Sequence, residues 1–142
     1  MATLGNFVSG QVLTASELNA IGTWQTYSPS CSWSSYGSFN FVKYSKVNEI
    51  VYLRFQFILT GTPSGTFDFD QPVVEVSGEA PAGTNGTAML RDSSGNEHVG
   101  FLYMSGTNVR IQTETSGIVD ATAPFTWASG DEIRGLMIYE AQ

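Results

Sequence analysis

One stretch of ten residues, from Ile50 to Leu59, places the tightest constraint on what this chain can fold into. Every second residue in it is apolar, namely Val51, Leu53, Phe55, Phe57 and Leu59. In an extended chain successive side chains point to opposite faces, so these five side chains form one apolar stripe. The opposite side is more polar, although Ile50 and Ile58 also lie on it. The pattern predicts a half-buried β-strand that forms one wall of a sheet-built core.

The rest of the chain after residue 23 carries shorter signals of the same kind. A partner strand is expected around residues 39–42, and further strands are predicted at 24–28, 66–70, 73–77, 87–91, 97–104, 108–115 and 132–139. Glycine-containing turns at 92–96 and 105–108 are typical of hairpins. Many short strands with almost no helix indicate an all-β fold. We expect residues 24–142 to form a single β-sandwich domain of jelly-roll-like type.

Residues 1–23 have a different character. Thr14 and Glu17 have the spacing of a capping box, and Gly22 is a common helix-terminating residue. They predict one short helix over about residues 15–21, preceded by an extended arm. So short a helix is marginal in isolation and needs something to pack against. We expect this arm to dock onto another protein through its apolar side chains, which are Phe7, Val8, Val12, Leu13, Leu18 and Ile21.

The composition limits the partners that such a domain can have. Only 13% of the residues are charged, about half the usual share. So few charges favour an oligomer that buries much of its surface, with a Ser- and Thr-rich monomer as the alternative. The net charge of −7 argues against nucleic acid as a partner. The chain has no apolar run of membrane-helix length and no signal-peptide pattern, so we expect synthesis in the cytoplasm without membrane insertion.

The residues that carry chemistry do not form a recognisable catalytic or metal-binding pattern. His98 is the single histidine, and Cys31 has no positive charge or helix N-terminus near it in the sequence. Asp68 and Asp70 share one side of a strand, but each alternates with a phenylalanine, as in a half-exposed strand. We therefore predict a protein that is not an enzyme, with no catalytic residue, no cofactor and no metal site.

Two stretches resemble virion surface proteins of tailed bacteriophages, of the short tail fibre, minor tail and head fibre or decoration types. Residues 7–29, FVSGQVLTASELNAIGTWQTYSP, match the G-x-x-L-T-A-x-x-L-N segment of these proteins and the W-x-x-Y-x-P that follows it. Residues 123–141, APFTWASGDEIRGLMIYEA, match their closing W-x-x-G-D-x-I-x-x-x-x-x-Y strand. Members of this group are typically β-sandwich modules that assemble as trimers on the virion.

The resemblance implies a homotrimeric surface fibre or spike subunit located in the virion. Residues 1–23 would anchor it to a capsid or tail protein, and loops of the sandwich would contact a host surface glycan or protein. The candidate receptor contacts lie in turn-like segments and are Thr84, Asn85, Ser93, Asn96, Thr107 and Asn108. Two alternatives remain open: a capsid decoration or cement protein, and a soluble lectin-like carbohydrate-binding module.

Overall fold

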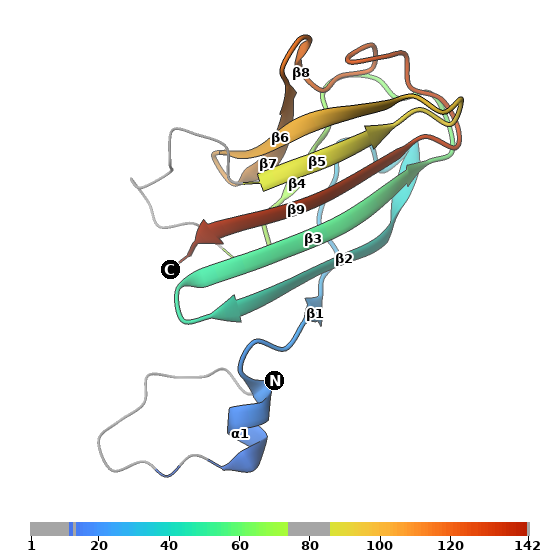
Figure 1. The fold of residues 1–142 in the computed structure, drawn as a ribbon. Helices are drawn as coiled ribbons and strands as arrows, with labels where there is room; N and C mark the ends of the chain where they lie inside the picture. The colour runs from blue at the N-terminus through green and yellow to red at the C-terminus, as the bar shows by residue number, and fades with distance from the viewer. Residues whose placement is uncertain (1–11, 13, 74–85, 142) are drawn as a thin grey trace.

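The computed structural model describes residues 12, 14–73 and 86–141 (Figure 1). Within these residues the chain forms one short helix and nine strands. In chain order they are α1 (Ala15–Ala20), β1 (Gln25–Thr26), β2 (Gly37–Val47), β3 (Ile50–Leu59), β4 (Asp68–Asp70), β5 (Gly86–Arg91), β6 (Glu97–Ser105), β7 (Asn108–Thr113), β8 (Gly117–Ile118) and β9 (Glu132–Glu140). The predicted all-β class is therefore confirmed.

All strand pairs are antiparallel and belong to one sheet. The strand order is β1-β2-β3-β9-β5-β6-β7-β4, and β8 pairs with β7. The neighbours β2–β3, β5–β6 and β6–β7 are consecutive in the chain, whereas the last strand, β9, is hydrogen-bonded between β3 and β5. The end of the chain therefore joins its early and late strands.

The sheet curls over until its β4 edge meets the chain segment that precedes β2. Cys31 forms a bridge with Phe69 of β4, the amide of Ser32 donates to the carbonyl of Asp68 over 3.0 Å, and the amide of Asp70 donates to the carbonyl of Ser30 over 3.0 Å. These bonds bring β4 across from β2 and β3. The ring centroids of Phe69 and Phe55 are only 4.8 Å apart. The two opposed walls give the sandwich-like arrangement that the sequence predicted.

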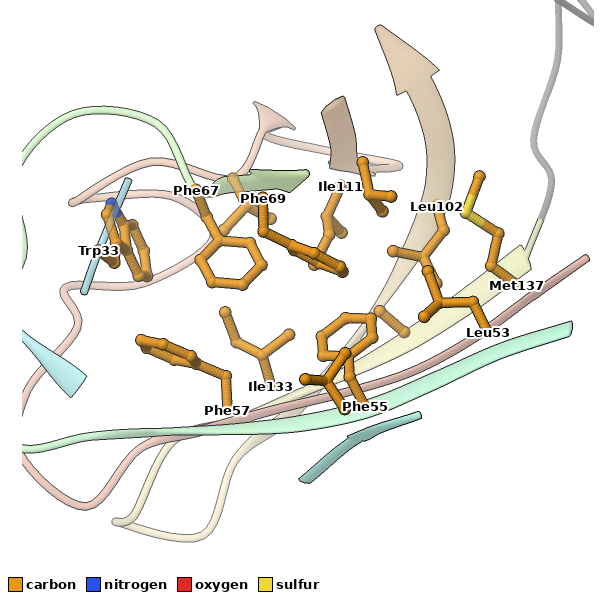
Figure 2. Packing of buried hydrophobic residues seen from close by; sticks show 14 of the residues in the cluster. Trp33, Leu53, Phe55, Phe57, Phe67, Phe69, Leu102, Ile111, Ile133 and Met137 are labelled. Atoms are coloured by element: carbon orange, nitrogen blue, oxygen red, sulfur yellow. The ribbon is translucent and has the colours of Figure 1, made fainter. Parts of the chain in front are cut away.

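An aromatic core fills the space between the two walls. Figure 2 shows Phe67 and Phe69 facing Phe57, Ile133 and Phe55 across the interior. The alternating stripe on β3 is confirmed, since all five of its apolar residues are buried. Two tryptophans, Trp33 and Trp127, close one end of the core, with their ring centroids 5.6 Å apart. Their indole N–H groups donate to the carbonyls of Gly65 and Ala123, so burying them leaves no donor unpaired.

A buried carboxylate holds the turn that leads into β9. Asp131 is 1% exposed, and its two carboxylate oxygens accept hydrogen bonds from the amides of Ser93, over 2.8 Å, and Ala128, over 2.7 Å. Its own carbonyl accepts from the amide of Leu59 over 2.9 Å. The adjacent Gly130 has a φ of 94°, which favours glycine. The Gly-Asp pair thus ties the start of β9 to the β5–β6 turn and to the end of β3.

The predicted short helix is also confirmed, although α1 ends one residue earlier than expected. Gly22 follows with a φ of 74°, as expected for a helix-terminating glycine. Figure 1 shows α1 beyond the β1–β2 edge of the sheet, and the described side chains at Ala15, Ser16 and Asn19 are exposed. No helix in the described part of the chain has the length and apolar character needed to cross a membrane.

Several expected strands differ from the structure in their bounds. The strand expected around 39–42 extends over Gly37–Val47, and the one expected at 66–70 begins only at Asp68. The strand expected at 24–28 contains only two residues, because the chain leaves the sheet after Thr26 to reach β4. The strand expected at 108–115 ends at Thr113, where a turn leads into β8. Residue 73 of the strand expected at 73–77 is not in a strand, and the remainder lies outside the described residues.

Candidate functional site

The outer face of the sheet, opposite the core, is unusually apolar at its centre. Five large side chains on β3, β5, β6 and β9 are between 38% and 63% exposed there. We call them the outer apolar band: Tyr52, Met89, Val99, Leu136 and Ile138. Tyr52 lies opposite Ile138, and Met89 lies opposite Val99. Leu136 connects the two pairs, because it stands two residues from Ile138 on β9 and opposite Thr87 on β5. The band is therefore continuous across four strands.

A charged network borders the band at the end where β9 begins. Glu132 accepts two hydrogen bonds from Arg134, at 2.9 and 2.6 Å, and one from Gln56 at 3.0 Å, and it lies 3.8 Å from Arg91. Burial of Glu132 raises its pKa, but the Arg134 and Gln56 hydrogen bonds and the two guanidinium charges outweigh it and hold the pKa below the ordinary value. Both cations of this network are therefore paired with a carboxylate of the same chain.

The loop residues expected to contact a receptor do not form one surface. Ser93 and Asn96 lie in the turn between β5 and β6, and Thr107 and Asn108 lie at the turn between β6 and β7. Because β6 has nine residues, these turns are roughly 30 Å apart along the strand. The amide of Ser93 is also engaged with Asp131. Thr84 and Asn85 lie outside the described residues.

The arm residues are only partly placed by the structure. Val12 is 86% exposed and Ile21 is 39% exposed, so neither is buried against the chain's own core. The backbone of Leu18 lies in α1. Phe7, Val8 and Leu13 lie outside the described residues. The described part of the arm is thus available for contacts, and its expected anchoring role stays a prediction.

The reactive residue types have ordinary structural environments. Burial, the largest influence, raises the pKa of the Cys31 thiol to about 11 despite a hydrogen bond from the Trp33 amide that lowers it. The His98 ring lies 5.4 Å from that of Phe125. Asp68 pairs with Arg110 at 3.3 Å, and Asp70 accepts from the amide of Ser30. In residues 12, 14–73 and 86–141, no three such side chains form a group that could hold a metal ion.

The outer apolar band is the feature that sequence reasoning missed. Leu136 to Tyr139 is a continuous apolar run, so its alternation between the two faces of β9 was not visible. The presence of Ile50 and Ile58 on the polar side of the β3 stripe was the available signal. Comparisons of the chain with protein-family models, with curated proteins and with solved structures found no match.

Proposed function

We propose that this chain is a structural subunit of a tailed-bacteriophage virion: a homotrimeric surface fibre or spike module, anchored through residues 1–23 and contributing to host attachment. The resemblance of residues 7–29 and 123–141 to phage virion proteins supports this assignment. The confirmed all-β fold agrees with it, since such modules are β-sandwiches.

The observation that carries the proposal is the outer apolar band. Contiguous apolar side chains in water are costly, and exposed patches of this kind mark protein interfaces. Its members come from four neighbouring strands of one rigid sheet, so the surface is preorganised and needs no rearrangement to pack. Cyclic association of three copies would cover the band and leave a closed assembly.

The described part of the arm supports the anchoring role. The six residues of α1 make up fewer than two turns, which is too short for a helix to be stable alone in water. Of the α1 side chains that the structure describes, those of Ala15, Ser16 and Asn19 are exposed and none lies in the buried core. A partner on the virion would supply packing for this short helix.

Sedimentation equilibrium of the purified chain tests the assembly. We expect a trimer, and Leu136→Glu combined with Val99→Glu should shift it to monomers by placing charges in the band. Thr62→Glu is the matched control, because Thr62 is exposed in a loop outside the band. A monomeric wild-type chain, or a double variant that associates as well as the control, would contradict the proposal.

Virion incorporation tests the location and the arm. A chain lacking residues 1–22 should still form trimers but should be absent from purified particles, and normal incorporation would contradict anchoring by the arm. Quantifying the intact chain against the major capsid protein distinguishes the alternatives. A few copies per particle favour a tail location, whereas tens to hundreds favour a decoration protein.

A further inference from the structure

Five of the six basic residues of this acidic chain fall into two groups. Arg91 and Arg134 both face Glu132, and Arg110 lies 3.3 Å from Asp68. Lys43 and Arg54, by contrast, have no carboxylate within ion-pair distance among the described residues. With 13 acidic residues and 6 basic ones, the chain has carboxylates in excess. The lack of a partner at these two positions is therefore not explained by composition.

Lys43 and Arg54 also lie directly opposite each other. They are cross-strand partners of β2 and β3 on the outer face of the sheet. Like charges in this position repel each other and destabilise the sheet. An anion bound between them would remove that repulsion and satisfy both cations.

Two aromatic rings hold the Arg54 guanidinium in place. Its central carbon lies 5.5 Å from the centroid of Trp24 and 5.0 Å from that of Phe41, both within cation–π range. Trp24 nevertheless remains 46% exposed, whereas Trp33 and Trp127 are fully buried. The cation is thus preorganised beside an indole whose surface is still accessible.

An open pocket of about 290 Å³ adjoins this cluster. It is lined by residues 26–29 together with Phe39, Phe41 and Val42. Phe41 lines the pocket and also contacts Arg54, and Thr26 lies opposite Lys43 on β1. The hydroxyl groups and aromatic rings of the pocket therefore lie next to the two cations.

We propose that Lys43, Arg54 and Trp24 form a binding site for a carboxylated saccharide. The carboxylate would accept hydrogen bonds from the guanidinium and the ammonium group. The C–H face of the sugar ring would pack on Trp24, and its hydroxyls would reach Thr26 and Ser28. The use of this site in host attachment rests on the proposed function, but binding itself is a property of the isolated chain.

Two other classes of acidic partner fit the site less well. A peptide added as a strand needs a regular edge, but the β2 register shifts between Phe39 and Phe41, and Pro29 in the pocket wall has no amide N–H to donate. A nucleic acid needs several cations along its phosphates, and here two stand in a chain of net charge −7.

Acrylamide quenching of tryptophan fluorescence provides a direct test. Only Trp24 of the three tryptophans is accessible to the quencher, so the other two serve as an internal reference. We expect glucuronic acid, galacturonic acid and N-acetylneuraminic acid to protect Trp24, and glucose, galactose and N-acetylglucosamine, with matched sodium chloride, to protect it much less. Protection should weaken as salt is added.

Three variants assign the binding to the residues. Arg54→Gln should weaken binding about tenfold, since it removes a charge-assisted hydrogen bond, and Lys43→Gln should weaken it less. Arg134→Gln is the matched control, because it removes the same charge from the same face of the sheet at a paired position. Trp24→Phe should abolish the quenchable component. Near-UV circular dichroism shows whether each variant keeps its fold.

Several outcomes would overturn the site. They are the absence of protection by all three acids, equal protection by the neutral sugars, equal protection by tetraglutamate, and an Arg54→Gln variant that binds like the control. These outcomes are independent of trimer formation and virion incorporation. A saccharide-binding chain that is monomeric would refute the proposed assembly alone, and a trimer without saccharide binding would refute this site alone.

Discussion

The two faces of the sheet both carry large apolar side chains but differ in how far these are buried. On the inner face, residues such as Leu53 and Phe55 are buried because β4 and β7 curl over them and supply an opposite wall. On the outer face, Leu136 and Ile138 have similar hydrophobicity but nothing in the described chain covers them. The inner face therefore stabilises the fold, and the outer face provides the surface on which the folded domain can bind a partner.

The outer face itself is divided between two groups of cations. Around Glu132, the guanidinium groups of Arg91 and Arg134 are both paired with one carboxylate of the same chain. At Lys43 and Arg54 the charges are held in place by strand pairing and aromatic rings but are not neutralised within the described residues. The first group serves the fold, and we assign the second to a ligand.

The sharpest contrast between the faces comes from two leucines. Leu53→Ala should lower the free energy of unfolding by about 2–5 kcal/mol, because it opens a cavity in the buried core. Leu136→Ala, at a position that is 51% exposed, should cost less than about 1 kcal/mol in the monomer. Urea denaturation at low protein concentration measures both, and equal losses would contradict the assignment of the faces.

Removing the buried carboxylate of Asp131 should also lower the free energy of unfolding. Asp131→Ala would leave the amides of Ser93 and Ala128 without acceptors, at a cost of about 3 kcal/mol. Asp131→Asn keeps one acceptor oxygen and should lose less. Thermal unfolding by circular dichroism compares the two, and an alanine variant as stable as the asparagine variant would show that the two amides find other partners.

Gly135 is a position where the inner face leaves no room for a side chain. A Cβ atom there would lie 2.4 Å from the Phe55 ring and 2.9 Å from a Leu102 methyl group. Gly135→Ala should therefore cost about 1–3 kcal/mol by overpacking. Gly61→Ala is the matched control, since a Cβ at Gly61 meets no atom within 4 Å. Chemical denaturation of both variants checks the difference, which should vanish if the core can relax around the methyl group.

Local patterns in the sequence were sufficient for the strands that form the inner wall. The β3 stripe, the β2–β3 hairpin and the position of α1 depend on residues close together in the chain, and all were predictable. The Gly-Asp pair before β9 is typical of a turn that leads into a strand, and this much is local. Its physical role appears when Asp131 is seen bonded to Ser93, which is 38 residues away.

The outer face could not be predicted because it depends on register between distant strands. The opposition of Lys43 and Arg54 follows from pairing that passes through the irregularity at Phe39 and Phe41. Trp24 reaches Arg54 only because β1 joins the edge of β2. Single-sequence patterns identify the residue types at such a site, but the fold decides which of them meet.

Breaking the Glu132 network has the smallest expected effect on stability. It tests whether the cations paired with Glu132 stabilise the fold. Because its hydrogen bonds and charges lower the pKa of Glu132 in the folded state, the ionised carboxylate stabilises the fold above its ordinary pKa of 4.5. That contribution is lost as the pH falls through the lowered folded-state value. At this partly exposed position, where water screens the charges, the contribution is worth no more than about 1 kcal/mol. Glu132→Gln should therefore reduce stability at pH 7 and have progressively less effect below pH 4.5.

A matched variant separates this network from general charge effects. Glu140 lies on the same face at the far end of β9 and is exposed, with no ion pair among the described residues, so Glu140→Gln removes the same charge away from the network. Denaturation curves between pH 3 and pH 7 should converge with wild type at low pH for Glu132→Gln only. Equal profiles for the two variants would mean that net charge, and not the paired arginines, governs this end of the face. Pairing with Glu132 would then add nothing to the stability of the fold, and Arg91 and Arg134 would not differ energetically from Lys43 and Arg54, which are unpaired among the described residues.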